Sequence, residues 1–315
     1  MAPRLIMKLQ VAAAEPTTPE VLHLVLVHPQ RPALPAWEAG AHIDLRLPDG
    51  RVRQYSLCGD PADRSRYEIA IKREEAGRGG SLWAHGHLGP GALAHVSAPR
   101  NAFPLAAGAR RHILVAGGIG ATPILAMTRT LAAEGADFAV HLCARSADTA
   151  PLLGALRAAC GERLLLYLSA EGRRFDPAGL PEPEPGTHLY VCGPPGLIAA
   201  VEAATAAKGW PPAQRHLERF APESDETFVP EPFDAVIAST GQVIRVPAET
   251  SLLAALRAEG FPLPSSCETG LCGSCLCGYR GGTVIHRDSV VPASERGERL
   301  APCVSRARGR LVLSL

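Results

Sequence analysis

Four cysteines near the C-terminus restrict the possible folds of this chain more than any other feature. Cys267, Cys272 and Cys275 follow the spacing C-x4-C-x2-C, and Cys303 follows after 27 further residues. Plant-type 2Fe–2S clusters are held by four cysteines in this arrangement. The loop that carries the first three is rich in glycine and serine, so backbone N–H groups can approach the thiolates and stabilise a reduced cluster. The spacing therefore predicts a 2Fe–2S cluster on these four residues.

A structural zinc site is the alternative for the same cysteines. Zinc modules usually carry two C-x2-C pairs, and only Cys272 and Cys275 form one here, which favours iron. Cys277 follows closely, and an extended chain would turn its thiol to the opposite face, where we expect a packed side chain. The other cysteines lie among apolar neighbours and are expected in the core, with a functional place left open only for the last: Cys58, Cys143, Cys160 and Cys192.

Composition and charge exclude several classes of protein. The 315 residues suffice for two or three domains, and 46% apolar with 20% charged side chains is ordinary for a globular protein. Lys and Arg number 32 against 31 Asp and Glu, so we expect no nucleic-acid or membrane partner. The N-terminus shows no signal segment, and the longest apolar stretch, 113–127, is too short to span a bilayer. These features predict a cytoplasmic protein.

Changes in pattern divide the chain into three modules. Up to Pro99, short alternating apolar stretches separated by turn residues predict a small antiparallel β-barrel or sandwich. From His112 onward, buried strands alternate with glycine loops and helices, which predicts an α/β domain with a parallel sheet. A proline-rich and acidic stretch suits a linker, and a hairpin with a short helix then precedes the cysteine loop. The predicted domains are 1–108, 109–222 and 234–315, with the linker at 223–233.

The cysteine module resembles a known family. SSCETGLCGSC, followed by HRDSVV and APCVSRA, is similar to the ferredoxin module of the phthalate dioxygenase reductase family. A flavin domain, a nicotinamide domain and a ferredoxin domain follow one another in that family, and the resemblance covers the chain from about Leu5 to Leu315. It implies FMN, NADH and a 2Fe–2S cluster as cofactors. The implied architecture is a flavin-binding β-barrel, an α/β nucleotide domain and a β-grasp ferredoxin domain.

The segment RQYSL, residues 53–57, resembles the R-x-Y-S-L flavin signature of that family. Alternation along a strand puts Arg53, Tyr55 and Leu57 on one face. There the arginine would neutralise a phosphate, and the tyrosine would pack beside the flavin ring. Ser56 faces the other way and is left to donate toward flavin N5. For this segment alone, an ordinary amphipathic edge strand is the alternative.

A phosphate site is predicted in the glycine-rich loop that follows Lys72. The sequence GRGGS includes Gly79 and Gly80 and opens a short helix, with Ser81 as the expected N-cap. Free N–H groups and the helix dipole favour the flavin phosphate at such a position, whereas a flexible hairpin loop is the alternative. The short connection offers no aromatic shelf for an adenine, which favours FMN over FAD.

Two strand-to-helix turns predict the pyridine nucleotide site. The strand at 112–116 leads into GGIGATP, where we expect Thr122 as N-cap and Pro123 as the first helical residue. A second strand ends in the turn CGPPG. Ligands gather at the carboxyl ends of parallel strands, so both turns are expected at one site. The residues assigned to it are Gly117, Gly118, Gly120, Thr122, Pro123, Cys192, Gly193 and Pro194.

The choice of nucleotide is predicted to depend on the residues after the strand at 138–143. Arg145 would hold a 2′-phosphate and Asp148 a ribose hydroxyl, so NADPH stays open beside the NADH that the family implies. By resemblance Cys192 lies beside the nicotinamide, with a packed thiol as the alternative. Phe220, in the family's closing segment HLERF, lies either near the flavin ring or in the core.

These modules together predict an NAD(P)H-dependent electron-transfer enzyme. A nicotinamide delivers two electrons as hydride and the cluster accepts one, so a flavin between them is required. Ser56 and Cys192 are the only catalytic candidates beyond the cofactors. The resemblance implies the reductase component of a Rieske-type aromatic oxygenase or O-demethylase. A reductase for a cytochrome P450 is the first alternative, and a non-catalytic redox or metal-binding module is the second.

Overall fold

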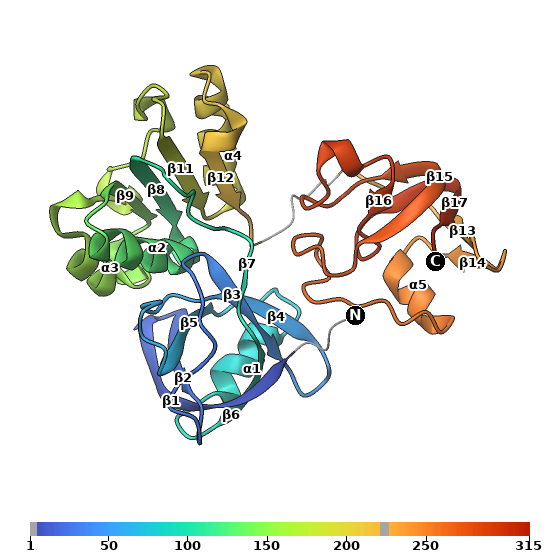
Figure 1. The fold of residues 1–315 in the computed structure, drawn as a ribbon, viewed down its shortest axis with the longest axis horizontal. Helices are drawn as coiled ribbons and strands as arrows, with labels where there is room; N and C mark the ends of the chain where they lie inside the picture. Colours follow the sequence, from blue (N-terminus) through green and yellow to red (C-terminus); the bar gives the residue numbers. More distant parts are fainter. Residues whose placement is uncertain (1–4, 221–226) are drawn as a thin grey trace. The chain divides into compact units, whose positions relative to one another are not determined.

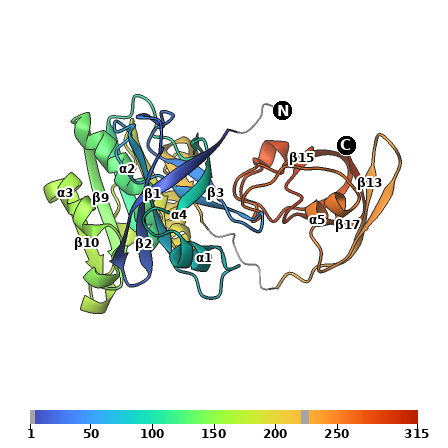
Figure 2. The same cartoon turned by 90° about the horizontal axis from the view of Figure 1, so that it is seen from below.

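The computed structural model describes residues 5–220 and 227–315. The described residues up to Arg219 form one compact unit, and those from Phe220 onward form a second. Figure 1 draws the first unit in blue to yellow and the second in orange to red, and Figure 2 shows the same elements from below. The two units are described separately here.

The N-terminal part of the first unit is an antiparallel barrel. Its strands are β1 (Ile6–Thr18), β2 (Val21–Val27), β3 (Ala41–Arg46), β4 (Val52–Ser56), β5 (Arg66–Lys72), β6 (Leu93–Ser97) and β7 (Arg100–Asn101). They pair in the order β4-β3-β6-β1-β2-β5, with β7 on β3. A bridge between Leu57 and Ile69 joins the two ends of this order. Helix α1 (Gly80–His87) follows β5, and the predicted antiparallel flavin-domain fold is confirmed.

The rest of the first unit is a parallel sheet with helices on both faces. The strands are β8 (Arg111–Gly117), β9 (Asp137–Ala144), β10 (Leu164–Leu168), β11 (Thr187–Cys192) and β12 (Arg215–Glu218), in the order β10-β9-β8-β11-β12. The helices are α2 (Ala121–Ala133), α3 (Leu153–Cys160) and α4 (Pro195–Ala207). Leu114 and Tyr190 face the core shared with α2 and α3, whereas Ile113 and Val191 pack with α4. The predicted α/β fold is confirmed.

One hydrophobic core runs through both parts of the first unit. It joins buried side chains of the barrel strands to those of α2, α3 and the parallel sheet. Arg129 on α2 crosses between the parts, donating to the Cys58 carbonyl at 2.9 Å and lying 3.5 Å from the Glu68 carboxylate. The boundary predicted at residue 108 therefore lies inside one compact unit, in the loop before β8.

The second unit is a mixed sheet with one helix, the β-grasp arrangement expected for a ferredoxin domain. Its strands are β13 (Phe233–Ile237), β14 (Val243–Val246), β15 (Cys277–Ile285), β16 (Arg299–Leu300) and β17 (Arg306–Leu313), in the order β14-β13-β17-β15-β16. Strands β13 and β17 are parallel, and the other pairs are antiparallel. Helix α5 (Leu252–Ala258) is capped by Ser251, whose hydroxyl accepts from the Ala254 N–H at 3.1 Å.

The helices are short, and two predicted caps are wrong because both helices begin earlier than expected. Gly79 precedes α1 and Gly120 precedes α2, and neither helix has a side-chain cap. The Ser81 hydroxyl instead accepts from the Glu74 N–H at 3.0 Å, and the Thr122 hydroxyl donates to a carbonyl of the preceding turn at 2.9 Å. Within residues 5–220 and 227–315, no helix is long and apolar enough to cross a membrane.

The linker predicted at 223–233 begins in residues 221–226, which lie outside the described part of the chain. Its later residues, which follow the undescribed segment, pack against the rest of the second unit. The Arg306 guanidinium donates to the Glu231 carbonyl at 2.8 Å, and the Arg287 guanidinium lies 3.9 Å from the ring centroid of Phe228. These contacts fasten the end of the predicted linker to the domain that follows it.

Candidate cofactor sites

The structure brings the four predicted iron ligands together as two pairs. The sulfurs of Cys275 and Cys303 are 3.3 Å apart, and Cys267 shares a hydrogen bond with Cys272. In the described residues, no three His, Cys, Asp or Glu side chains are close enough to hold one metal ion. Two thiolates for each iron is the ligand set of a 2Fe–2S cluster with four cysteines. The residues present therefore fit that cluster.

Hydrogen bonds between the cysteines favour the thiolate at one member of each pair and raise the pKa of the other member, Cys272 or Cys303. The Cys272 thiol lowers the pKa of Cys267 to about 5, helped by the N–H groups of Thr269 and Leu271. The Cys303 thiol likewise lowers the pKa of Cys275. Iron binds the thiolate and not the thiol, so this loop is arranged to hold its metal. Cys277, in contrast, packs in the core behind the site, and burial raises the pKa of its thiol to about 12.

At the predicted flavin phosphate site, one guanidinium nitrogen of the half-buried Arg53 has no hydrogen-bond partner. Arg53 on β4 donates to the Val52 carbonyl at 2.8 Å through one guanidinium nitrogen, while its Nη2 is buried with no hydrogen-bond partner. A Cβ on Gly80, at the start of α1, would lie 2.7 Å from Arg53 Nε. Arg53 therefore lies against the uncapped N-terminus of α1, and the two features together suit a phosphate. The residues present fit the phosphate end of FMN.

Two further arginines surround this position, and the sequence analysis did not single them out. Arg51 contacts the Arg78 carbonyl, and its guanidinium would be 3.6 Å from a Cβ on Gly79. Burial first, and then the charges of Arg78 and Arg51, lower the pKa of Arg53. Arginines that repel one another in this way favour an anion between them. Because 27 residues separate Arg51 from Arg78, no local pattern in the sequence marked them as a pair.

The remaining flavin candidates lie in different surroundings. Tyr55 is half-buried, and burial raises the pKa of its phenol to about 12. Ser56 is buried, and Leu57 is fully buried in the core beyond the end of β4, so Leu57 does not line an open face. Lys72 pairs with Glu74 at 2.7 Å, and the same glutamate's N–H bonds Ser81. Lys72 and Ser81 are thus joined through the loop before α1.

The two predicted nucleotide turns meet, as the parallel register requires. Ala116 at the end of β8 pairs with Cys192 at the end of β11. A Cβ on Gly120 would lie 2.1 Å from the Cys192 carbonyl oxygen, and one on Gly117 would lie 2.6 Å from Pro194. Only glycine allows this approach, which leaves backbone N–H groups free to face a pyrophosphate. Thr122 and Pro123 are buried within α2 and pack there.

Glu218 is a candidate that the sequence analysis missed. It lies at the end of β12, beside Cys192, and the Cys192 sulfur is 3.9 Å from the Glu218 carboxylate. Burial raises the pKa of Glu218 to about 8, and it also raises the pKa of Cys192. Cys192 is fully buried. The thiol and a carboxyl group that titrates near neutral pH are therefore paired at the carboxyl end of the sheet.

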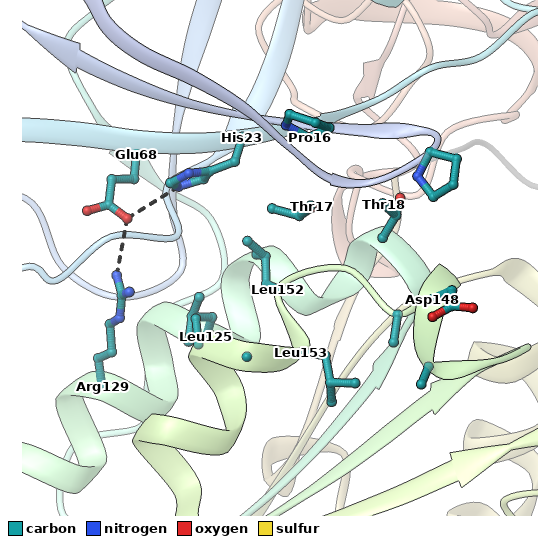
Figure 3. A pocket seen from close by; sticks show the side chains of 15 residues that line it. Pro16, Thr17, Thr18, His23, Glu68, Leu125, Arg129, Asp148, Leu152 and Leu153 are labelled. Atoms are coloured by element: carbon teal, nitrogen blue, oxygen red, sulfur yellow. Dashed lines mark hydrogen bonds and ion pairs between the residues drawn. The ribbon is translucent and has the colours of Figure 1, made fainter.

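A cavity of about 780 Å³ lies on the seam between the barrel and helices α2 and α3. Figure 3 shows Glu68, His23 and Arg129 at one end and Asp148 at the other. The Glu68 carboxylate is 3.3 Å from the His23 ring, and hydrogen bonding to His23 with the charge of Arg129 lowers its pKa to about 2. Asp148 is exposed on the cavity wall after β9, and Arg145 is exposed outside it.

Phe220 does not anchor a core, so that alternative is wrong. Its side chain is 41% exposed, at the end of the described residues that precede the predicted linker.

The other cysteines expected in the core behave as predicted in three cases: Cys58, Cys160 and Cys192 are buried. Cys143 is only half-buried.

Comparison with known proteins identifies the family. Residues 236–308 match the family described as 2Fe-2S iron-sulfur cluster binding domain, and residues 97–214 match the N-terminal domain of dimethylamine monooxygenase subunit DmmA-like proteins. Phthalate dioxygenase reductase from Burkholderia cepacia is 36% identical over 98% of this chain and 97% of its own. A solved phthalate dioxygenase reductase, described as a modular structure for electron transfer from pyridine nucleotides to [2Fe-2S], aligns with a TM-score of 0.78 and 36% identity over 98% of both chains. The chain belongs to the phthalate dioxygenase reductase family.

Other relatives serve different oxygenases. The heme-dependent oxidative N-demethylase beta subunit of Ectopseudomonas mendocina is 41% identical over 98% of both chains. The vanillate O-demethylase oxidoreductase of Pseudomonas putida is 43% identical over 88% of this chain and 90% of its own. An intact type IV self-sufficient cytochrome P450 monooxygenase aligns with a TM-score of 0.84 and 38% identity, and this chain, covered to 98%, spans 41% of that one.

Family membership confirms the predicted class of enzyme and its cofactors. As a member of this family, the protein is an oxidoreductase of the kind that passes electrons from a pyridine nucleotide to a 2Fe–2S cluster in oxygenase systems. The flavin and 2Fe–2S domains of the fold occur in the predicted order. The alternative of a non-catalytic redox or metal-binding module is therefore wrong.

Proposed function

We propose that this protein is the reductase component that supplies electrons from NADH to a Rieske-type aromatic oxygenase or O-demethylase. The observation that carries the proposal is the combination, in one chain, of an unpartnered Arg53 nitrogen, two glycine turns that meet, and two cysteine pairs. Bound FMN would accept the hydride of NADH and release its electrons singly. Relatives of matching length are named vanillate O-demethylase oxidoreductase and phthalate 4,5-dioxygenase oxygenase reductase subunit.

The chain's own residues would bind and orient these groups. Arg53, with Arg51 and the start of α1, would hold the FMN phosphate, and Tyr55 would pack by the ring. The turns at 117–120 and 192–194 would hold the nucleotide, with Cys192 and Glu218 shielding its reactive end from water. The domains would be 1–108 for flavin, 109–222 for nucleotide and 234–315 for the cluster. The iron ligands would be Cys267, Cys272, Cys275 and Cys303.

NADH is proposed as the donor because Asp148 follows the carboxyl end of β9, where an acidic residue can bind a ribose hydroxyl. Both Asp148 and Arg145 are exposed after β9, and the carboxylate lines the cavity while the guanidinium does not. A carboxylate at that position disfavours a 2′-phosphate. The nine cysteines are all free thiols, which supports a reducing, cytoplasmic location.

An oxygenase that contains heme, such as a cytochrome P450, is the second candidate partner. It is favoured by the 41% identity to the heme-dependent oxidative N-demethylase beta subunit and by the 38% identity to an intact self-sufficient cytochrome P450 monooxygenase. Anaerobic electron transfer from the NADH-reduced protein to purified Rieske and heme oxygenase components would separate the candidates. The proposal expects fast reduction of a Rieske component. Reduction of heme components alone would replace it with the second candidate, and reduction of neither would contradict both.

A further inference from the structure

The HRDSVV segment near the cysteines contains a carboxylate with no exposure to water. Asp288 lies between β15 and β16, and its side chain is 0% exposed. One carboxylate oxygen accepts from the N–H groups of Val291 at 2.8 Å and Val290 at 3.2 Å. The other accepts from the Ser305 hydroxyl at 3.2 Å. Burying a carboxylate is costly unless it is hydrogen-bonded in this way. We therefore asked what the Asp288 carboxylate does at this place in the fold.

The same residue lies against both segments that carry the cysteine pairs. Ser305 is two residues beyond Cys303, and the neighbouring Ser289 N–H donates to the Gly270 carbonyl at 3.2 Å. Gly270 lies between Cys267 and Cys272 at a φ of +79°, and a Cβ there would be 3.1 Å from the Asp288 Cα. Because Gly270 has no side chain, the Asp288 backbone can pack directly against the cluster loop.

We propose that Asp288 is a positioning residue that also sets the reduction potential of the 2Fe–2S cluster. The inference rests on the proposed cluster site. Reduction adds one electron, and so one negative charge, to a cluster whose thiolates and sulfides already make it negative. The Asp288 carboxylate accepts hydrogen bonds from two N–H groups and one hydroxyl, and its neighbour Ser289 is bonded to the loop that carries the cysteines. The field of the carboxylate opposes the added electron, and cluster potentials respond to such charges and to solvent exposure.

One positive side chain, that of Arg296, acts on the same segment with the opposite sign. The His286 ring lies 3.4 Å from the Asp288 carboxylate. The exposed Arg296 donates to the Val291 carbonyl at 3.3 Å and to the Asp288 carbonyl at 3.5 Å. Arg296 keeps its charge at every working pH. Removing it should therefore make the cluster harder to reduce, whereas removing the Asp288 charge should make it easier.

The test measures the midpoint potential of the cluster by spectroelectrochemical titration of the holoprotein, with its EPR spectrum and iron content. Asp288→Asn keeps the shape and an oxygen for the turn N–H groups but removes the charge. A buried charge at about 10 Å in an effective dielectric of about 20 shifts an equilibrium roughly tenfold. We expect a potential higher by about 59 mV, the one-electron equivalent of tenfold. Ser305→Ala keeps the charge and should stay within roughly threefold of wild type.

The outcomes are distinguishable. A wild-type protein that holds no iron or sulfide contradicts the proposed function itself. A loaded Asp288→Asn protein with an unchanged or lower potential overturns the inference. An equal rise in Ser305→Ala also overturns it, because repacking would then explain the shift. If Asp288→Asn does not load its cluster, Arg296→Gln decides: a more negative potential supports the inference, and an unchanged or higher one refutes it.

Discussion

Replacing Gly120 with alanine should disable the nucleotide site by forcing its two turns apart. The new Cβ would lie 2.1 Å from the Cys192 carbonyl oxygen and 2.4 Å from its carbon, both backbone atoms of the facing turn. Backbone cannot rotate away as a side chain can, so the two turns must separate. Overpacking of this kind costs about 3 kcal/mol. A displacement of about 1 Å at a reacting group lowers the rate roughly 100-fold.

The assay is stopped-flow reduction of the flavin by NADH, with thermal unfolding measured in parallel. Gly196→Ala is the matched control, because its Cβ would meet nothing within 4 Å in the first turn of α4. The control should keep the wild-type rate and gain slightly in stability, since alanine favours a helix. A Gly120→Ala protein with the wild-type rate of flavin reduction would refute the contact between the turns.

Three further perturbations test other parts of the molecule. Cys303→Ser should abolish the cluster's absorption while flavin reduction by NADH continues; loss of both would contradict separate sites. Arg53→Leu should lower FMN affinity by at least about tenfold, measured by fluorescence, because a charge-assisted bond is lost. The raised pKa of Glu218, about 8, makes wild type lose stability relative to Glu218→Gln as pH rises from about 4.5 to 8. If the difference in unfolding free energy between the two proteins does not change with pH, the raised pKa of Glu218 is contradicted.

Regular elements were predictable because their patterns are local. The alternation before Pro99 and the hairpin before the cysteine loop predicted strands where the structure has them, β2 and β14 among them. The starts of α1 and α2 were mispredicted because glycines preceding them let the backbone turn without a side-chain cap. A serine or threonine in the first turn is a cap signal only when the chain cannot begin its helix earlier.

The sites were predictable where the spacing of residues in the chain reflects the chemistry. The cysteine loop is one continuous segment, so its ligands could be assigned from sequence. Glu218 could not, because 26 residues separate it from Cys192 and only the pairing of β11 with β12 brings them together. Arg51 and Arg78 converge for the same reason, since a loop and a strand far apart in sequence meet at the start of α1.

The central claim is that one polypeptide converts a pair of electrons into single ones. Coulometric reduction of the purified protein under anaerobic conditions tests it most directly. The account predicts an uptake of about three electrons per chain, two bleaching a yellow chromophore and one producing the EPR signal of a reduced 2Fe–2S cluster. An uptake of about two with no EPR signal, or of about one with no flavin bleaching, would contradict the claim.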